Sequence, residues 1–518
     1  MQLVACHTSA LRADKHMTIQ APLRLFAATL TLSISACSSP GPKSLSVADM
    51  KALSSEAQTS AASNVEPLTE ALSLNAAMAR ALKYNSNRRV KLLEEALANN
   101  QVDVSKLDML PKLVASAGLA HRSIERATYS STYPGMVKGT SASFSSDTNH
   151  GNVDLGLTWN LLDLGLGYYG TQQSTDRLFI SLEQRRKAMH QLMQDVRVAY
   201  WRAAAAQLLK DKVRQTITVA ESALEDAKKV EVSGQSNPID SLRYQRQLLE
   251  NLRLLETINQ ELSSANIELA SLINAPLGTQ IMLSQLDAGE DSNEVLSLPV
   301  DRLETATLQN NPDLRESAYS ARIARTELRK TMARLFPNVS FNYSVKYDTD
   351  KFLVDRNWNE AGLQVSFNLF NIFTGPTQVK LAKAGIALAD QRRVATQLAV
   401  ISQMHISRLA LINAENNFSR ADAIYKTDLR ISELINNRAQ ARKQSELDRV
   451  SNDTAAIVSL LRRYQAMSQV QTAQARLRAN LGLEPEIGNT QELSLTALTQ
   501  QLEKAAPPWS ALKQPSGW

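Results

Sequence analysis

Apolar and polar residues alternate at two places along the chain, and a long helical pattern follows each place. The apolar positions of the first alternation are Val153, Leu155, Leu157, Trp159 and Leu161. Residues between them are polar or glycine, which predicts a strand with one apolar face. From Gly170 no proline occurs before Pro238, and apolar residues take helical spacing. A helix of this length would reach on the order of 90 Å, so it suits a tube or coiled coil better than a globular domain.

The same succession recurs later in the chain, which indicates a tandem duplication. At an offset of 208, the matching pairs are Trp159 with Phe367, Asn160 with Asn368, and Gly167 with Gly375. Ahead of the strand the offset is 226, and the pairs are Asn85 with Asn311 and Pro111 with Pro337. The difference, 226 − 208 = 18, places one insertion between Pro111 and Val153. We therefore predict two repeats, at 68–290 and 291–486.

Each repeat is expected to read helix, helix, strand, strand, long helix, return helix. In the first repeat these elements are predicted at about 72–85, 88–109, 112–122, 153–161, 170–234 and 238–274. In the second they are predicted at about 302–310, 313–334, 339–346, 363–369, 378–436 and 445–480. Residues 121–151 are interpreted as a solvated loop and 487–518 as a C-terminal tail.

The return helices carry their own signals. Leucines recur every seven residues in the first return helix, at Leu248, Leu255, Leu262 and Leu269. A heptad seam of this kind needs a partner helix. Asn274 and Gly482 end the two return helices, and both residue types suit a left-handed cap.

The N-terminus resembles a bacterial lipoprotein signal peptide, which we assign to residues 1–36 with a possible true start at Met17. Arg24 precedes an apolar run, and Ile34-Ser-Ala-Cys37 resembles a lipobox. Cys37 is therefore the predicted site of lipidation, including palmitate, and 37–67 would be a flexible tether. Ser38, rather than Asp, follows the cysteine and points to the outer membrane. Since Cys37 would be the sole cysteine of the mature chain, disulfides and cysteine metal sites are excluded.

No run of eighteen apolar residues follows Cys37, so the sequence predicts no membrane-spanning helix. A protein that spans a bilayer with strands must close its sheet. Four strands of about ten residues have the length of barrel strands but are too few to close one. Three chains would supply twelve strands, and their long helices would extend the pore as a helical tube. The predicted fold class is a mixed α and β membrane protein, with a trimeric 12-stranded β-barrel continued by a periplasmic α-helical barrel.

Composition and isolated motifs offer little chemistry. The formal net charge is +6 and no basic cluster is interleaved with aromatics, so a nucleic-acid partner is not expected. Six histidines lie without ligand spacing, and we predict no catalytic residues, no metal and no cofactor. Gly165, Gly167 and Gly170 match a dinucleotide fingerprint, but the helix that follows is too long for a βαβ unit. These glycines, with Gly375 in the second repeat, are interpreted as relieving crowding where strand meets helix.

The arrangement resembles the TolC-like outer-membrane efflux factors over roughly residues 68–486. The resemblance rests on Asn85 and Asn311, on Leu110-Pro111 and Phe336-Pro337, and on Trp159-Asn-Leu-Leu-Asp163 and Phe367-Asn-Leu-Phe-Asn371. It implies a homotrimeric conduit in outer-membrane lipid that docks a periplasmic adaptor protein and an inner-membrane pump. Such a channel is not an enzyme.

The resemblance also implies site residues. In the family, helix tips meet the adaptor, and an Ile-Asp-x-Leu-like pattern follows each turn. The matching tip residues are Gly234, Asp240, Leu242, Asp448 and Val450, although the second tip lacks a glycine. Rings of carboxylates close many family channels, and Asp428 and Glu433 are our gate candidates. A solvated helix face, with Arg430 as ion-pair partner, is the alternative for these two residues.

Other functions remain open from the sequence alone. A type I protein or polysaccharide secretion channel would share the predicted architecture. A periplasmic coiled-coil lipoprotein would explain the heptads but not the four strands. A membrane-bound enzyme would need a polar constellation that the sequence does not show.

Overall fold

The computed structural model describes residues 44–63, 65–68, 70–132, 137–233, 237–279, 281–284, 293–440, 446–483, 490, 492–504 and 512. The chain divides into two units, residues 1–63 and residues 64–518. Cys37 and the predicted signal peptide lie outside the described residues. No helix within the described ranges combines the length and the apolar character needed to cross a bilayer.

The first unit contains helix α2, Val47–Ala62, where we expected part of a tether without regular structure. Ser46 caps this helix, and the Ser46 side chain and the Asp49 carboxylate each accept a hydrogen bond from the other residue's backbone N–H. Such a capping box stabilises the first turn of a helix. None of the residues of α2 is buried, so capping and helix propensity, rather than packing, account for it.

The second unit contains the two repeats. The helices of the first are α3 (Leu74–Tyr84), α4 (Ser86–Leu107), α5 (Leu161–Val232) and α6 (Pro238–Leu272). Those of the second are α8 (Val300–Asn310), α9 (Pro312–Ala333), α10 (Asn371–Gln440) and α11 (Glu446–Asn480), with the short α7 (Asn293–Leu296) before them and α12 (Leu495–Lys504) after them. At 72 and 70 residues, α5 and α10 are each on the order of 100 Å long.

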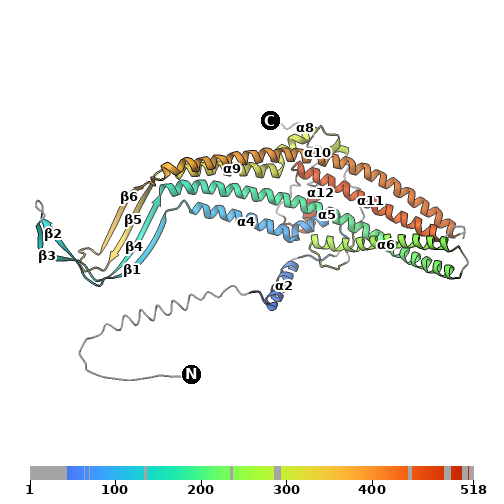
Figure 1. Ribbon diagram of the computed structural model, residues 1–518, viewed down its shortest axis with the longest axis horizontal. Helices are drawn as coiled ribbons and strands as arrows, with labels where there is room; N and C mark the ends of the chain where they lie inside the picture. The colour runs from blue at the N-terminus through green and yellow to red at the C-terminus, as the bar shows by residue number, and fades with distance from the viewer. Residues whose placement is uncertain are drawn as a thin grey trace, which may run out of the picture. The chain divides into compact units, whose positions relative to one another are not determined.

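Four strands form one antiparallel sheet at one end of this unit (Figure 1). They are β1 (Lys112–His121), β4 (Asn149–Asn160), β5 (Asn338–Asp348) and β6 (Asn357–Ser366), in the order β1-β4-β5-β6. The two repeats meet inside the sheet, where β4 pairs with β5. The register keeps Leu155 beside Ala115 on one side and Val345 on the other, so apolar residues share one face.

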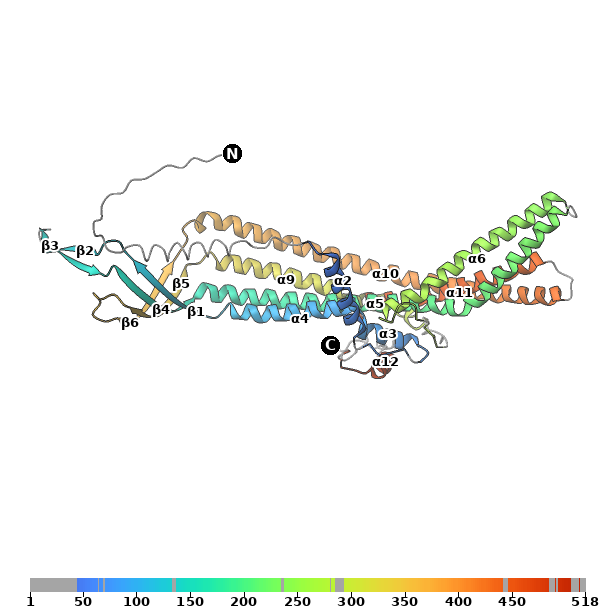
Figure 2. The same ribbon diagram turned by 90° about the horizontal axis from the view of Figure 1, so that it is seen from below.

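The helices continue the order of the strands as a single layer. Each strand is joined to one helix, and the helices in contact are α4 with α5, α5 with α9, and α9 with α10. Further from the sheet, α6 and α11 take the places of α4 and α9, because they pack on α5 and α10 respectively (Figure 2). The predicted leucine seam of α6 is confirmed, since all four heptad leucines are buried.

Two equivalent asparagines join the successive helices of the layer. The Asn85 side chain accepts from Arg88 N at 3.1 Å and donates to Leu272 O at 3.1 Å. The Asn311 side chain accepts from Asp313 N at 2.9 Å and donates to Asn480 O at 3.0 Å. Each amide therefore caps the start of α4 or α9 and satisfies a carbonyl at the end of α6 or α11. Leu272 and Asn480 differ by the repeat offset of 208, so the duplication preserved this joint.

Left-handed caps end both return helices, as the sequence predicted. Asn274 has φ 52° and Gly482 has φ 66°. A Cβ on Gly482 would lie 2.3 Å from Asn310 O. Glycine is therefore required there both by its backbone angle and by the close approach of α11 to the end of α8.

The glycines at the strand-to-helix junctions were predicted to relieve crowding, and this holds at the equivalent positions Gly167 and Gly375. A Cβ on Gly167 would lie 2.8 Å from Met109 Cγ, and one on Gly375 would lie 3.1 Å from Leu335 Cδ2. Gly165 meets nothing within 4 Å. Gly167 and Gly375 thus let α5 and α10 approach the ends of α4 and α9, whereas Gly165 relieves no crowding.

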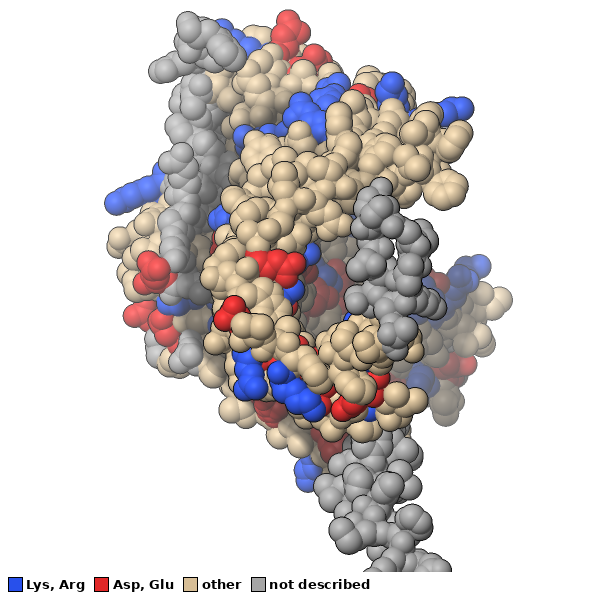
Figure 3. Space-filling model, turned by 90° about the vertical axis from the view of Figure 1, so that its left-hand side faces the viewer, with Lys and Arg blue, Asp and Glu red and all other residues tan. Residues whose placement is uncertain are grey.

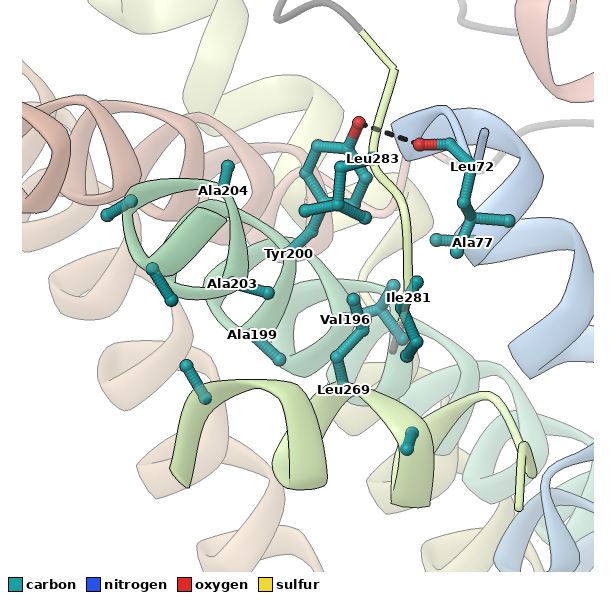
Figure 4. Close-up of a cluster of buried hydrophobic side chains, with 14 of the residues drawn as sticks. Leu72, Ala77, Val196, Ala199, Tyr200, Ala203, Ala204, Leu269, Ile281 and Leu283 are labelled. Atoms are coloured by element: carbon teal, nitrogen blue, oxygen red, sulfur yellow. Dashed lines mark hydrogen bonds between the residues drawn. The ribbon is translucent and has the colours of Figure 1, made fainter. Parts of the chain in front are cut away.

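The largest apolar cluster surrounds α5, which packs against α3 and also against α6 (Figure 4). Tyr200 fixes this region by donating its hydroxyl to Leu72 O at 3.0 Å. Helix α12 contributes Leu498 and Leu502 to the same cluster. The segment that we interpreted as a tail therefore contains a helix that is part of the core of the first repeat.

Other elements also differ from the sequence prediction. The segment interpreted as a solvated loop contains a second sheet, the hairpin of β2 (Arg126–Thr132) and β3 (Val137–Ser146). Strand β6 lies at 357–366 rather than 363–369, because residues 367–370 turn into the helix. Both long helices begin about eight residues earlier than predicted, so the glycines lie inside the first turns rather than before them.

Candidate channel wall and helix tips

The sheet has one apolar face and one polar face, and the apolar face is exposed. Its large exposed side chains are Leu113, Val153, Leu155, Trp159, Phe341, Val345, Leu363 and Val365. On the other face Lys346 pairs with Glu360 at 2.5 Å, and Asp154 lies opposite Lys346 in the register. Figure 3 looks onto this end of the chain and shows broad areas without charged side chains. An uncovered apolar face of this extent marks a membrane or protein contact.

The layer has two unpaired edges. Strands β1 and β6 each pair on one side only, and every residue of both is exposed. The adjoining helices α4 and α10 carry exposed apolar stripes that sequence reading missed. On α4 the stripe is Val90, Leu93, Leu97 and Val104, and on α10 it is Leu381, Leu388 and Leu398. Their helical spacing in the sequence is the signal that could have identified them.

The two helix hairpins end at the other end of the second unit (Figure 1). Asp240 lies in the first turn of α6 and pairs with Arg243 at 3.6 Å, and Leu242 is 53% exposed. Gly234 lies outside the described residues, as does the side chain of Asp448. Val450 is 1% exposed and packs with Leu248 and Leu252. Asp240 and Leu242 are thus available at the surface, whereas Val450 belongs to the core between the hairpins.

The candidate gate residues lie on α10, in its last part before the second tip. Asp428 is half-buried and Glu433 is exposed. Neither carboxylate forms an ion pair with another described residue, so the pairing with Arg430 that belonged to the alternative interpretation is absent from that part of the chain. Five residues correspond to about 140° around a helix. Asp428 and Glu433 therefore point in different directions. If the channel axis runs along one side of α10, only one of the two side chains can face it.

A cluster that the sequence did not reveal joins α10 to α11, about two turns before Asp428 and about three turns before Glu433. Asp422 accepts from Arg463 Nε at 2.5 Å and from Lys426 Nζ at 2.7 Å. The Arg463 guanidinium lies 5.8 Å, 5.7 Å and 5.8 Å from the ring centroids of Phe418, Tyr425 and Tyr464. Cation–π contacts and charge-assisted hydrogen bonds thus hold the two helices of the second hairpin together.

The Asp422 contacts predict a pH dependence. The hydrogen bonds from Lys426 and then Arg463 hold the pKa of Asp422 below its usual value. The folded state therefore gains stability that is present above the ordinary aspartate pKa of about 3.9 and is lost as pH falls through the lowered folded pKa. We expect Asp422→Asn to destabilise the α10–α11 hairpin at neutral pH by about 1–3 kcal/mol, with the difference from wild type vanishing at strongly acidic pH.

Hydrogen exchange of α10 and α11 measures this effect. Asp226→Asn is the matched control. Asp226 forms an exposed ion pair with Lys229 at 3.3 Å, so its replacement should lower the stability by less than about 0.5 kcal/mol. Equal protection of the hairpin in Asp422→Asn and wild type at neutral pH would contradict the assignment.

Among the described residues no group of histidine, cysteine or acidic side chains could hold a metal ion. The polar side chains of the second unit are instead distributed along the helices in ion pairs between neighbours. Examples between α5 and α9 are Lys187 with Asp313 at 2.7 Å and Arg315 with Glu183 at 3.6 Å. These pairs hold adjacent helices of the layer together.

Comparison with known proteins agrees with this geometry. Residues 78–275 match the model of the family described as outer membrane efflux protein. No protein with a curated function matches the chain.

Several solved structures share the fold. The Campylobacter jejuni CmeC outer membrane channel is similar with a TM-score of 0.63 and 13% identity, covering 83% of this chain and 89% of that one. A membrane protein from Pseudomonas aeruginosa has a TM-score of 0.58 and 16% identity, covering 82% and 92%. The open state of the Neisseria gonorrhoeae MtrE outer membrane channel has a TM-score of 0.57 and 17% identity, covering 79% and 88%. The likeness therefore extends over both repeats, beyond the region matched by the family model.

Proposed function

Since residues 78–275 belong to the outer membrane efflux protein family, we propose that the chain is the outer-membrane channel of a tripartite efflux system. It would be a passive conduit that receives its cargo from a periplasmic adaptor and an inner-membrane pump. It catalyses no reaction. The TolC-like resemblance of the sequence agrees with the family match.

The observation that carries this proposal is the pair of unpaired edges on a two-faced layer. Among the residues that the structure describes, strands β1 and β6 have no partner strand on their outer sides, and unpaired backbone donors and acceptors are not tolerated inside a bilayer. Pairing β6 of one copy with β1 of the next satisfies both edges, and three copies close twelve strands. The apolar stripes of α4 and α10 lie at the same two edges and would meet across the same interface.

The faces of the sheet determine which side meets lipid. The exposed apolar face would contact the bilayer, and the face with Lys346, Glu360 and Asp154 would line the pore. The hairpins would extend into the periplasm, with Gly234, Asp240 and Leu242 of the first tip and Asp448 of the second tip toward the adaptor. Val450, which is buried, would hold the two hairpins together behind the second tip. Cys37 would carry the lipid that attaches the N-terminus to the same membrane.

Purification of the mature chain in detergent followed by recording in planar bilayers tests the proposal. We expect a heat-resistant trimer that inserts and conducts ions without consuming any substrate. A monomer that is freely soluble without detergent would refute it. Deleting the protein should sensitise cells to toxic small molecules, whereas a secretion defect without sensitisation would favour a protein or polysaccharide export system.

The same recordings test the gate. Three symmetry-related carboxylates near an axis repel one another and attract cations. Because Asp428 and Glu433 face different directions, we expect one of the variants Asp428→Ala and Glu433→Ala to raise conductance and lower cation selectivity while the other leaves both unchanged. No change in either variant would remove both residues as gate candidates.

A further inference from the structure

A groove on the second unit, close to the sheet, gathers basic side chains. It encloses about 840 Å³ between the ends of α4 and α9 and the start of α5. Arg322, Arg325 and Arg329 line it from α9, and Lys106 lines it from α4. The spacing of the arginines, three and then four residues, places all three on one side of α9, and all three are exposed. We call this the arginine groove.

Three of these four basic side chains already form an ion pair within the described part of the chain, and Arg329 is the fourth. Arg322 pairs with the buried Asp176, Arg325 pairs with Asp390 at 2.8 Å, and Lys106 pairs with Asp103 at 2.8 Å. Among the described residues Arg329 forms no ion pair. The groove therefore retains one uncompensated cation beside two exposed guanidinium groups, which is an arrangement that attracts a phosphate.

The groove lies on the face of the layer that carries α3. Gln172 lines it from α5 and lies 28 residues before Tyr200, whose hydroxyl donates to Leu72 O just ahead of α3. Multiples of seven residues return to nearly the same side of a supercoiled helix. The larger groove on α9 and α10 is lined by Ile323 and Glu327, which lie on the opposite side of α9 from the arginines. A closed tube has room for α3 and α12 only on its convex side, so the arginine groove faces outward.

The arginine groove lies just beyond the ends of the strands, which places it at the boundary of the proposed membrane-spanning region. Lys106 precedes the first residue of β1 by six residues, and Arg329 precedes that of β5 by nine. The headgroup zone is about 5–8 Å thick on each side of a bilayer, and basic pockets at this level bind anionic headgroups. Tyr168, 54% exposed at the groove, is a residue type that favours this interface. Since α4 and α10 are the edge helices, a neighbouring copy would not cover a groove over α5.

From this geometry, and resting on the proposed outer-membrane location, we propose that the arginine groove binds the phosphate of an anionic phospholipid in the periplasmic leaflet. Arg325 and Arg329 hold the phosphate, while Arg322 stays paired with Asp176 and fixes the wall of the groove. The exposed apolar face of the adjacent sheet receives the acyl chains.

The test compares lipid retention by the purified full-length trimer in nanodiscs that contain phosphatidylcholine and phosphatidylglycerol. Native mass spectrometry should find phosphatidylglycerol enriched on the wild-type protein. Arg325→Gln with Arg329→Gln should lower that retention by roughly tenfold or more while sparing the Asp176–Arg322 pair. Arg246→Gln with Arg253→Gln on α6 is the matched control, because it removes two exposed charges far from the sheet.

Each outcome decides the inference. An equal fall in the control would mean general electrostatic attraction and would overturn the site. Displacement of the lipid by millimolar inorganic phosphate would identify a soluble anion as the ligand and would also overturn it. An inserted, conducting trimer that retains both lipids equally would refute the groove while leaving the channel in place, whereas failure to form a trimer would count against the channel itself.

Discussion

Val345→Arg is expected to abolish insertion into the membrane, whereas Ser344→Arg is expected to be tolerated. Val345 lies on the exposed apolar face of β5, between Leu155 and Asn359 in the register. An arginine on the lipid face near the middle of a barrel costs about 2–4 kcal/mol, and a trimer would carry three copies. Ser344 lies on the opposite, polar face with Glu360 as its neighbour on β6, so a new arginine there can share the carboxylate that already pairs with Lys346.

The measurement is the fraction of protein that forms heat-resistant oligomers in liposomes. Because the two residues are adjacent on one strand, both variants add the same charge at nearly the same depth and differ mainly in the face of the sheet that carries it. Insertion of both variants would show that the apolar face does not meet lipid. Failure of Ser344→Arg alone would mean that the two faces are assigned the wrong way round.

Gly482→Ala is expected to cause the second large effect, a loss of about 3–5 kcal/mol of folding free energy. The left-handed backbone accounts for about 1–2 kcal/mol of this loss. The remainder comes from collision of the new Cβ with Asn310 O, which lies 2.3 Å from its ideal position. This carbonyl belongs to the last residue of α8, just before the Asn311 cap, so the collision separates α11 from the joint that connects it to α9.

Gly278→Ala separates the two contributions. Gly278 has φ 91° but nothing within 4 Å of its ideal Cβ, so this variant carries the backbone strain without the collision. We expect the midpoint of thermal unfolding, compared at one scan rate, to fall further for Gly482→Ala than for Gly278→Ala. Equal shifts would show that the chain accommodates the methyl group by moving α8.

The elements that the sequence could predict are those in which apolar residues recur with a clear period. Leu155 and Leu157 alternate with polar residues, which predicted the strand β4. Leu248 and Leu255 are seven residues apart, which predicted the leucine seam of α6. Asn85 and Asn311 were recognisable as equivalent because they share an offset with Pro111 and Pro337. Their double role could not be predicted, because the partner carbonyls lie nearly two hundred residues away in the first repeat.

Elements without an apolar face were missed for the same physical reason. The β2–β3 hairpin is built mostly from serine, threonine and small residues, so no period-two contrast distinguishes it from a loop. Helix α2 has no buried residue, and its one local signal was the Ser46–Asp49 capping box. In contrast, α12 could have been found, because Leu495, Leu498 and Leu502 have helical spacing.

The candidate site divides in a similar way. The positions of Asp240 and Leu242 followed from a local motif after a helix break, and the structure leaves both exposed. The contact between Asp422 and Arg463 spans 41 residues and depends on how α10 and α11 are aligned in their hairpin. The sequence does not reveal that alignment, so this side-chain link near the candidate gate could not be predicted.

The β2–β3 hairpin has a consequence for symmetry. It fills the 18-residue insertion and therefore exists in the first repeat only, whereas the corresponding link between β5 and β6 is short. Six almost equivalent repeat units would surround the pore of an assembled channel, but only three of them would end in a ribbon. The rim at the cell exterior would consequently have threefold symmetry even where the wall beneath it approximates sixfold symmetry. An external molecule that engages all the ribbons at once would have to match that lower symmetry.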